Sequence, residues 1–134
     1  MRVVAAGLTA VIMSFIFNKT VLKLFGAPVV VLLVPLIEEA TKTGSAFYWD
    51  DSILGTHLFF GLSEAFYDIG TGEKRVAAPI FSFLGHGLFG LAASITVSRT
   101  DSILLGMVMG TFLHSIWNGV MVNIFKKAQP KALL

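Results

Sequence analysis

Apolar residues group into five long stretches, which short polar stretches separate. The apolar stretches cover roughly residues 3–17, 24–48, 53–67, 76–97 and 103–125. A helix that crosses the hydrocarbon of a bilayer needs about 20 mostly apolar residues. The pattern therefore predicts an all-α fold, a polytopic membrane helix bundle of about five transmembrane helices. Four crossings is the alternative, because the first stretch is short.

The connections between these stretches are brief and polar. They are Asn18-Lys19-Thr20, Asp50-Asp51-Ser52, residues 70–75 and residues 98–102. Since no connection is long enough for a soluble domain, residues 1–134 are predicted to form a single membrane-embedded helical domain. Arg2 before the first stretch resembles the start of a signal peptide, but no small-residue cleavage site follows. We interpret that stretch as the first span, and Pro28 and Pro35 as candidates for a bend in the second.

Composition supports a membrane protein and excludes several other classes. Hydrophobic residues make up 55% of the chain and charged residues 13%, whereas soluble domains carry about 25% charged residues. The net charge of +2 is too small to indicate a nucleic-acid partner. Without cysteine, the chain forms neither disulfides nor thiolate metal sites.

Basic residues predict an orientation if all five stretches cross the membrane. Lys42 falls inside the second stretch and Arg2 and Arg99 lie on one side, whereas the other side holds Lys19, Lys23, Lys74, Arg75, Lys126, Lys127 and Lys131. Cytoplasmic loops are enriched in Lys and Arg. We therefore expect the N-terminus outside and the C-terminus in the cytoplasm of a cell membrane.

Ionisable residues recur at one depth in the predicted bundle. At a rise of about 1.5 Å per residue, four such residues lie roughly 14–17 Å from the same outer surface: Glu39, Glu64, His86 and His114. Such groups are costly in lipid and need partners that lipid cannot supply. Four of them on consecutive spans predict one shared internal site.

Local spacing places further residues on the same helix faces. Residues four apart share a helix face, and the pairs with this spacing are Glu38 and Lys42, Phe60 and Glu64, His86 and Gly90, and His114 and Asn118. Gly85, Gly87 and Gly90 leave one face of the fourth predicted helix nearly bare, which permits close approach of another helix or of an extended peptide.

These residues form an ordered set that resembles a known family. The set consists of E-E-x-x-K (Glu38, Glu39, Lys42), F-x-x-x-E (Phe60, Glu64), His86 with Gly90, and H-x-x-x-N (His114, Asn118). It is similar to the motifs of the PrsW family, within the larger group of CAAX-processing and bacteriocin-processing intramembrane endopeptidases. The Glu of the third span and the Lys after the Glu pair favour the PrsW branch. The resemblance covers about residues 34–120, and PrsW-like proteins usually carry additional membrane helices.

The resemblance implies an intramembrane protease, which hydrolyses a peptide bond of a membrane-anchored protein or peptide. By the same resemblance, a single-span regulatory protein such as an anti-sigma factor is a plausible substrate.

The candidate catalytic residues also follow from the chemistry of hydrolysis, which needs an activated water and donors to the oxyanion. Glu39 or Glu38 is the candidate general base; we favour Glu39, with Glu38 paired to Lys42 at i,i+4. His86 is a candidate for positioning the water, and His114 and Asn118 are candidate oxyanion donors. Glu64 is a candidate for orienting a histidine.

A metal-dependent hydrolase is the close alternative. Two histidines and one or two glutamates match the ligands of a catalytic zinc site, and the candidates are Glu39, Glu64, His86 and His114. No compact H-E-x-x-H motif is present, so zinc would need ligands from several helices. Larger relatives have been described both as metalloproteases and as glutamate proteases.

Other interpretations stay open. The same buried groups suit a proton- or cation-coupled transporter, or the chain is a noncatalytic scaffold that binds a partner helix. Glu38, Glu39 and Lys42 also suit a purely structural ion pair. For His57, near the outer end of its span, we expect a hydrogen bond to a backbone carbonyl.

Overall fold

The protein is described by a computed structural model, which covers residues 1–70 and 77–128. All regular structure in these residues is helical. The elements are α1 (Arg2–Phe25), the 3-10 helix η1 (Ala27–Val31), α2 (Leu33–Tyr48), α3 (Ile53–Gly70), α4 (Ala77–Thr100) and α5 (Ile103–Ala128). The predicted all-α helix bundle is therefore confirmed.

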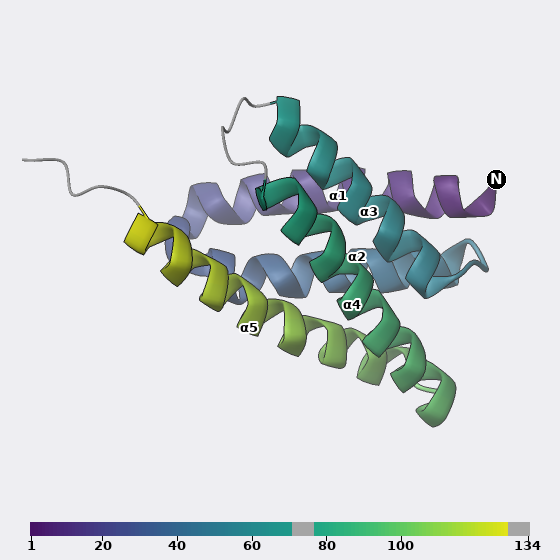
Figure 1. Cartoon of the computed structure of the whole chain (residues 1–134). Helices are drawn as coiled ribbons and strands as arrows, with labels where there is room; N and C mark the ends of the chain where they lie inside the picture. Colours follow the sequence, from purple (N-terminus) through teal and green to yellow (C-terminus); the bar gives the residue numbers. More distant parts are fainter. Residues whose placement is uncertain (71–76, 129–134) are drawn as a thin grey trace, which may run out of the picture.

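The helices run alternately up and down, and α2 lies among the others. It contacts α1, α3 and α5, while α3 packs on α4 and α4 packs on α5. Figure 1 shows α3 and α4 crossing the antiparallel pair of α1 and α2, with α5 along the other side of α2. Side chains that point inward from α2 therefore meet residues from several helices.

Three of the helices have the length and apolar composition of membrane spans. They are Arg2–Phe25, Pro79–Thr100 and Ile103–Ile124, and their length and composition indicate membrane association. The other two are shorter, with 16 residues in α2 and 18 in α3. These two also carry the buried or half-buried charged residues Glu38, Glu39, Lys42 and Glu64. Charge within these helices lowers the hydropathy that identifies a span.

The predicted break at Asn18-Lys19-Thr20 is wrong, because α1 continues through these residues to Phe25. Polar side chains are compatible with a helix when they find partners or reach water. Asn18 donates to Glu38, the Thr20 hydroxyl donates to the carbonyl of Ile16 within the helix, and Lys19 is exposed.

The chain instead breaks at Gly26, which separates α1 from η1. Gly26 has a φ of 75°, a left-handed conformation that glycine adopts without steric cost. The predicted second stretch, residues 24–48, is thus divided among the end of α1, η1 and α2. Pro35 lies in the first turn of α2, where a missing N–H costs no helical hydrogen bond.

The two tight turns at the other end of the bundle are built alike. Asp50 follows α2 with a φ of 50°, and Asp101 follows α4 with a φ of 51°. Aspartate is one of the few residues other than glycine that tolerates this conformation. The predicted connection 98–102 shortens accordingly, because α4 extends to Thr100.

The interior of the bundle is more polar than its surface. Among the largest fully buried side chains are Lys42, His57, Glu39, Thr43 and Thr56, whereas many large apolar side chains are exposed on every helix. This distribution suits a bilayer, where lipid covers the apolar exterior and polar groups must find partners inside.

Candidate functional site

Helix α2 supplies the centre of the polar interior. Glu38, Glu39 and Lys42 project from one side of the helix, and they are 5%, 0% and 0% exposed. Residues three and four apart lie on the same face of a helix. Because α1, α3 and α5 surround α2, this face points into the bundle rather than to lipid.

Both carboxylate oxygens of Glu39 have partners. Oε1 accepts a hydrogen bond from Nζ of Lys42 at 2.5 Å and one from Nδ1 of His114 at 3.0 Å. Oε2 lies 2.8 Å from Nε2 of His57. Glu39 therefore joins α2, α3 and α5 in one fully buried network, in which three cationic or proton-bearing groups surround a single carboxylate.

His57 also belongs to this network, a role that was not predicted from the sequence. The expected hydrogen bond to a backbone carbonyl is present, from Nδ1 to the oxygen of Ile53 at 2.8 Å. The expected place near the outer interface is wrong, because His57 is 0% exposed and its other nitrogen contacts Glu39. The spacing of seven residues to Glu64, two helical turns on one face, was the available signal.

A second chain of hydrogen bonds runs from Lys42 towards the surface. Nζ of Lys42 lies 2.9 Å from Nδ1 of His86. An ammonium only donates, so Nδ1 accepts and the ring proton of the neutral histidine lies on Nε2. Nε2 donates to Oε2 of Glu64 at 2.6 Å, and the hydroxyl of Ser82 donates to the same oxygen. The ring of Phe60 lies 4.6 Å from Nζ of Lys42, which adds a cation–π contact.

Helices α4 and α5 hold the two site histidines against aromatic side chains. Phe89 stacks on His114, with ring centroids 4.7 Å apart and an interplanar angle of 20°. His86 meets both rings edge to face. This packing fixes the ring planes of both histidines.

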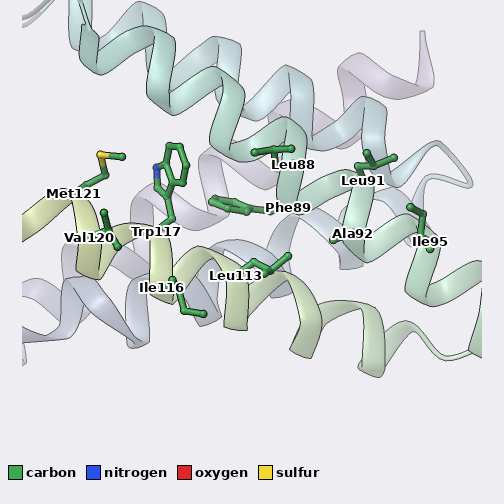
Figure 2. A pocket seen from close by; sticks show the side chains of 10 residues that line it. All are labelled: Leu88, Phe89, Leu91, Ala92, Ile95, Leu113, Ile116, Trp117, Val120 and Met121. Carbon is green, nitrogen blue, oxygen red and sulfur yellow. The ribbon is translucent and has the colours of Figure 1, made fainter.

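Phe89 also borders an apolar groove on the outside of the bundle. The groove has a volume of about 510 Å³ and lies between α4 and α5. Figure 2 shows Phe89 and Trp117 among its lining side chains, which are all apolar apart from the indole. Phe89 therefore contacts both this groove and the ring of His114.

Glu38 has the opposite environment to Glu39. Its Oε1 accepts a hydrogen bond from Asn18 at 2.9 Å, but no group in the described residues forms a hydrogen bond with its buried Oε2. The nearest groups to Oε2 are Nζ of Lys42 at 3.7 Å and Nε2 of His114 at 3.9 Å. The predicted i,i+4 ion pair of Lys42 with Glu38 is present at 3.7 Å, but Lys42 makes its closer contact with Glu39, which is one residue nearer along the helix.

The Asn118 amide donates to a backbone group rather than to a side chain of this cluster. Its Nδ2 donates to the carbonyl oxygen of Val30 in η1 at 3.0 Å, so the amide ties α5 to the segment that precedes α2. Its assignment as an oxyanion donor stays a prediction. The structure brings the remaining candidates together, namely Glu38, Glu39, Glu64, His86 and His114.

The donor set can be compared with a zinc site. Within the described residues, one oxygen of Glu38 and one nitrogen each of His86 and His114 lie within 4.8 Å of one another, so this group contains Glu38 in place of the predicted Glu39 and Glu64. However, both nitrogens of His86 are engaged, by Lys42 and Glu64, and the Lys42 ammonium lies 3.7 Å from Glu38. A buried ammonium beside these donors repels a divalent cation. The arrangement therefore does not fit zinc.

A scan against protein-family models finds no match for this chain, and searches of curated proteins and of solved structures find no similar protein.

Proposed function

We propose that this chain is an intramembrane endopeptidase, which hydrolyses a peptide bond of a membrane-anchored protein or peptide with a water activated by Glu38. Glu38 replaces Glu39, the base favoured from the sequence, because both oxygens of Glu39 are bonded. The observation that carries this proposal is the unpartnered Oε2 of Glu38, buried 3.9 Å from Nε2 of His114. An unpaired carboxylate oxygen in a protein interior costs several kcal/mol. A functional site is a common reason for such an arrangement.

Two hydrogen-bond acceptors face each other at this point. Nδ1 of His114 donates to Glu39, so Nε2 of the neutral ring carries a lone pair. Oε2 of Glu38 is also an acceptor in its ionised form. A water that donates one hydrogen to each would satisfy both atoms and would leave its own lone pairs free to attack.

The proposed reaction balances without any additional reactant. Glu38 accepts a proton from the water, and the water oxygen forms a bond to the carbonyl carbon of the substrate. The carbon–nitrogen bond then breaks, and the proton passes to the leaving amine. Lys42 holds positive charge 3.7 Å from Oε2 of Glu38, and this charge favours the negative charge that develops on the carbonyl oxygen.

Glu64 offers a connection between the buried network and the surface. Its side chain is 40% exposed, whereas that of His86 is 3% exposed. The resemblance of the same residues to the PrsW motifs supports hydrolysis as the use of this network and a single-span regulatory protein as its substrate.

The proposed orientation has the N-terminus outside and the C-terminus in the cytoplasm. Lys19 and Lys23 lie at the same end of α1 as the start of α2. Lys74, Arg75 and Lys131, like the side chains of Lys126 and Lys127, lie outside the described residues. Because the chain has no cysteine, single cysteines at Asp50 and Lys19 would report sidedness with an impermeant thiol reagent.

The test of hydrolysis uses purified chain in proteoliposomes, mixed with solubilised single-span membrane proteins. Mass spectrometry of new N-termini should show cleavage within or beside apolar segments for the parent chain. The Glu38→Gln variant should remain folded and produce none of these termini. Identical termini from parent and variant would contradict the proposal.

A proton-coupled transporter is the second candidate, favoured by the continuous contacts from Glu64 through His86 and Lys42 to Glu39. Such a chain of titratable groups is typical of proton relays. A pH-sensitive dye inside the same proteoliposomes separates the two functions. Proton uptake without new termini would select transport over hydrolysis.

A further inference from the structure

His57 is the buried titratable group that the proposed reaction does not use. It comes from α3, is 0% exposed and contacts Glu39 rather than Glu38. It lies outside the motif residues that carry the family resemblance. Its two ring nitrogens are both bonded, which determines where protons lie in this part of the network.

The short contact between His57 and Glu39 requires a proton between the two side chains, which a neutral Nδ1–H ring and an ionised carboxylate do not supply. Nδ1 lies 2.8 Å from the carbonyl oxygen of Ile53, and a carbonyl only accepts, so Nδ1 carries a hydrogen. Nε2 of the neutral ring would then be an acceptor facing an acceptor oxygen at 2.8 Å. A proton must therefore lie between Nε2 and Oε2, on either atom.

The bond to His57 also determines which groups the other oxygen of Glu39 contacts. With Oε2 held by His57, Oε1 accepts from Lys42 and from Nδ1 of His114. The proton of His114 is thereby kept on Nδ1, and the lone pair of Nε2 faces Oε2 of Glu38 at 3.9 Å. If Glu39 rotated, the tautomer of His114 would no longer be selected.

Two glycines hold the His57–Glu39 pair in place. A Cβ at Gly90 of α4 would lie 2.5 Å from Cβ of His57, and a Cβ at Gly110 of α5 would overlap Oε2 of Glu39. Backbone from both helices therefore lies directly against the pair. The charged or titratable groups nearest to it are Lys42 from α2 and His114 from α5.

We infer that His57 is a positioning residue, which holds Glu39 so that His114 keeps its proton on Nδ1 and presents the lone pair of Nε2 to the water bound at Glu38. The role in catalysis depends on the hydrolysis proposed above. The effect on the tautomer of His114 does not, because it follows from the hydrogen bonds alone.

The test is a ¹⁵N spectrum of the histidine rings in the full chain, in nanodiscs and with a tag that contains no histidine. The chain has 3 histidines. Three variants that each replace one histidine assign the spectrum, because each variant loses one set of signals. In the parent, His114 should show only the Nδ1–H tautomer. In His57→Phe, it should show both tautomers.

Matched variants separate positioning from a purely structural role. His57→Gln places an amide N–H where Nε2 lies and should restore the Nδ1–H tautomer, whereas His57→Asn reaches only towards Ile53 and should not. The Asn variant replaces His57→Phe if the latter does not fold. Thr56→Val, at the buried neighbouring position whose hydroxyl bonds only Ser52, should leave His114 unchanged. A single Nδ1–H tautomer in folded His57→Phe or His57→Asn would overturn the inference.

A kinetic test measures kcat and KM of the same variants with a substrate that the parent chain cleaves. Loss of a residue that orients a catalytic group typically lowers activity on the order of 10- to 100-fold. His57→Asn should lower kcat by this amount with KM unchanged, and His57→Gln should recover most of it. Equal kcat in the parent and in His57→Asn, with tautomers mixed in the variant, would remove the catalytic role. Absence of cleavage by the parent would instead reject the proposed hydrolysis and leave the spectra to decide the role of His57.

Discussion

Glu38 and Glu39 are neighbours in sequence and opposites in environment. Around Glu39, both carboxylate oxygens are bonded, by Lys42, His57 and His114. Around Glu38, one oxygen is bonded to Asn18 and the other has no hydrogen-bond partner. The carboxylate of Glu39, with both oxygens bonded, holds the helices together. The carboxylate of Glu38, with one oxygen that forms no hydrogen bond to the described residues, is available for reaction.

The largest expected difference is in stability. Glu39→Leu removes the closest carboxylate partner of the fully buried Lys42 ammonium, and breaking a buried ion pair typically costs about 3–5 kcal/mol. Glu38→Leu removes the hydrogen bond from Asn18 and the longer ion pair with Lys42 but leaves Lys42 bonded to Glu39, so the loss should be smaller. Unfolding of both variants in mixed micelles provides the measurement. Equal losses would remove the distinction between the two residues.

A smaller loss of stability is expected for Gly110→Ala on α5. The added Cβ would overlap Oε2 of Glu39, and overpacking of this kind costs about 1–3 kcal/mol. Gly119→Ala on the same helix is the matched control, because its Cβ would lie 3.7 Å from Val31. There, the better helix propensity of alanine should stabilise the chain by up to about 1 kcal/mol. The same unfolding assay distinguishes the two, and similar stability would contradict the tight packing around Glu39.

Loss of the hydrogen bond from Asn18 to Glu38 should affect activity more than stability. Asn18 donates to its Oε1, so Asn18→Leu should leave Glu38 free to rotate and reduce cleavage roughly 10-fold, at the lower end for a residue that orients a catalytic group. Asn123→Leu is the control, because Asn123 is exposed and bonds only its own helix, at Gly119. Initial rates on one substrate measure the effect. Unchanged rates in the Asn18 variant would show that Glu38 needs no such support.

No effect is expected from removal of metal ions. Lys42 already supplies positive charge beside Glu38 and His86, so the site as arranged needs no divalent cation. Cleavage rates before and after dialysis against a chelator, with metal content measured in the same samples, test this directly. Loss of cleavage that zinc restores would contradict the role assigned to Lys42.

Much of the fold could be predicted from the sequence, because hydropathy alone separates apolar helices from polar turns. The turn at Asp50 lies where the polar residues predict it. The end of α1 could not be found in this way, since Asn18 and Lys19 resemble a turn in sequence but are compatible with a helix. The actual break depends on the backbone conformation of Gly26.

The site residues could be selected from the sequence, but not their partners. A depth estimate assumes parallel, straight helices, and it placed His57 too near the surface. In the structure α3 crosses α2, so that Glu39 meets His57 while Lys42, one turn away, connects through His86 to Glu64. The choice of Lys42 between two adjacent carboxylates depends on side-chain geometry that spacing does not determine.

The most direct test of the account is cleavage in water enriched in ¹⁸O. Purified parent chain in proteoliposomes should produce a new carboxyl terminus that carries one ¹⁸O atom, and Glu38→Gln, folded as the parent is, should produce none. Products of equal yield from the Glu38→Gln variant would contradict the claim that Glu38 activates the attacking water.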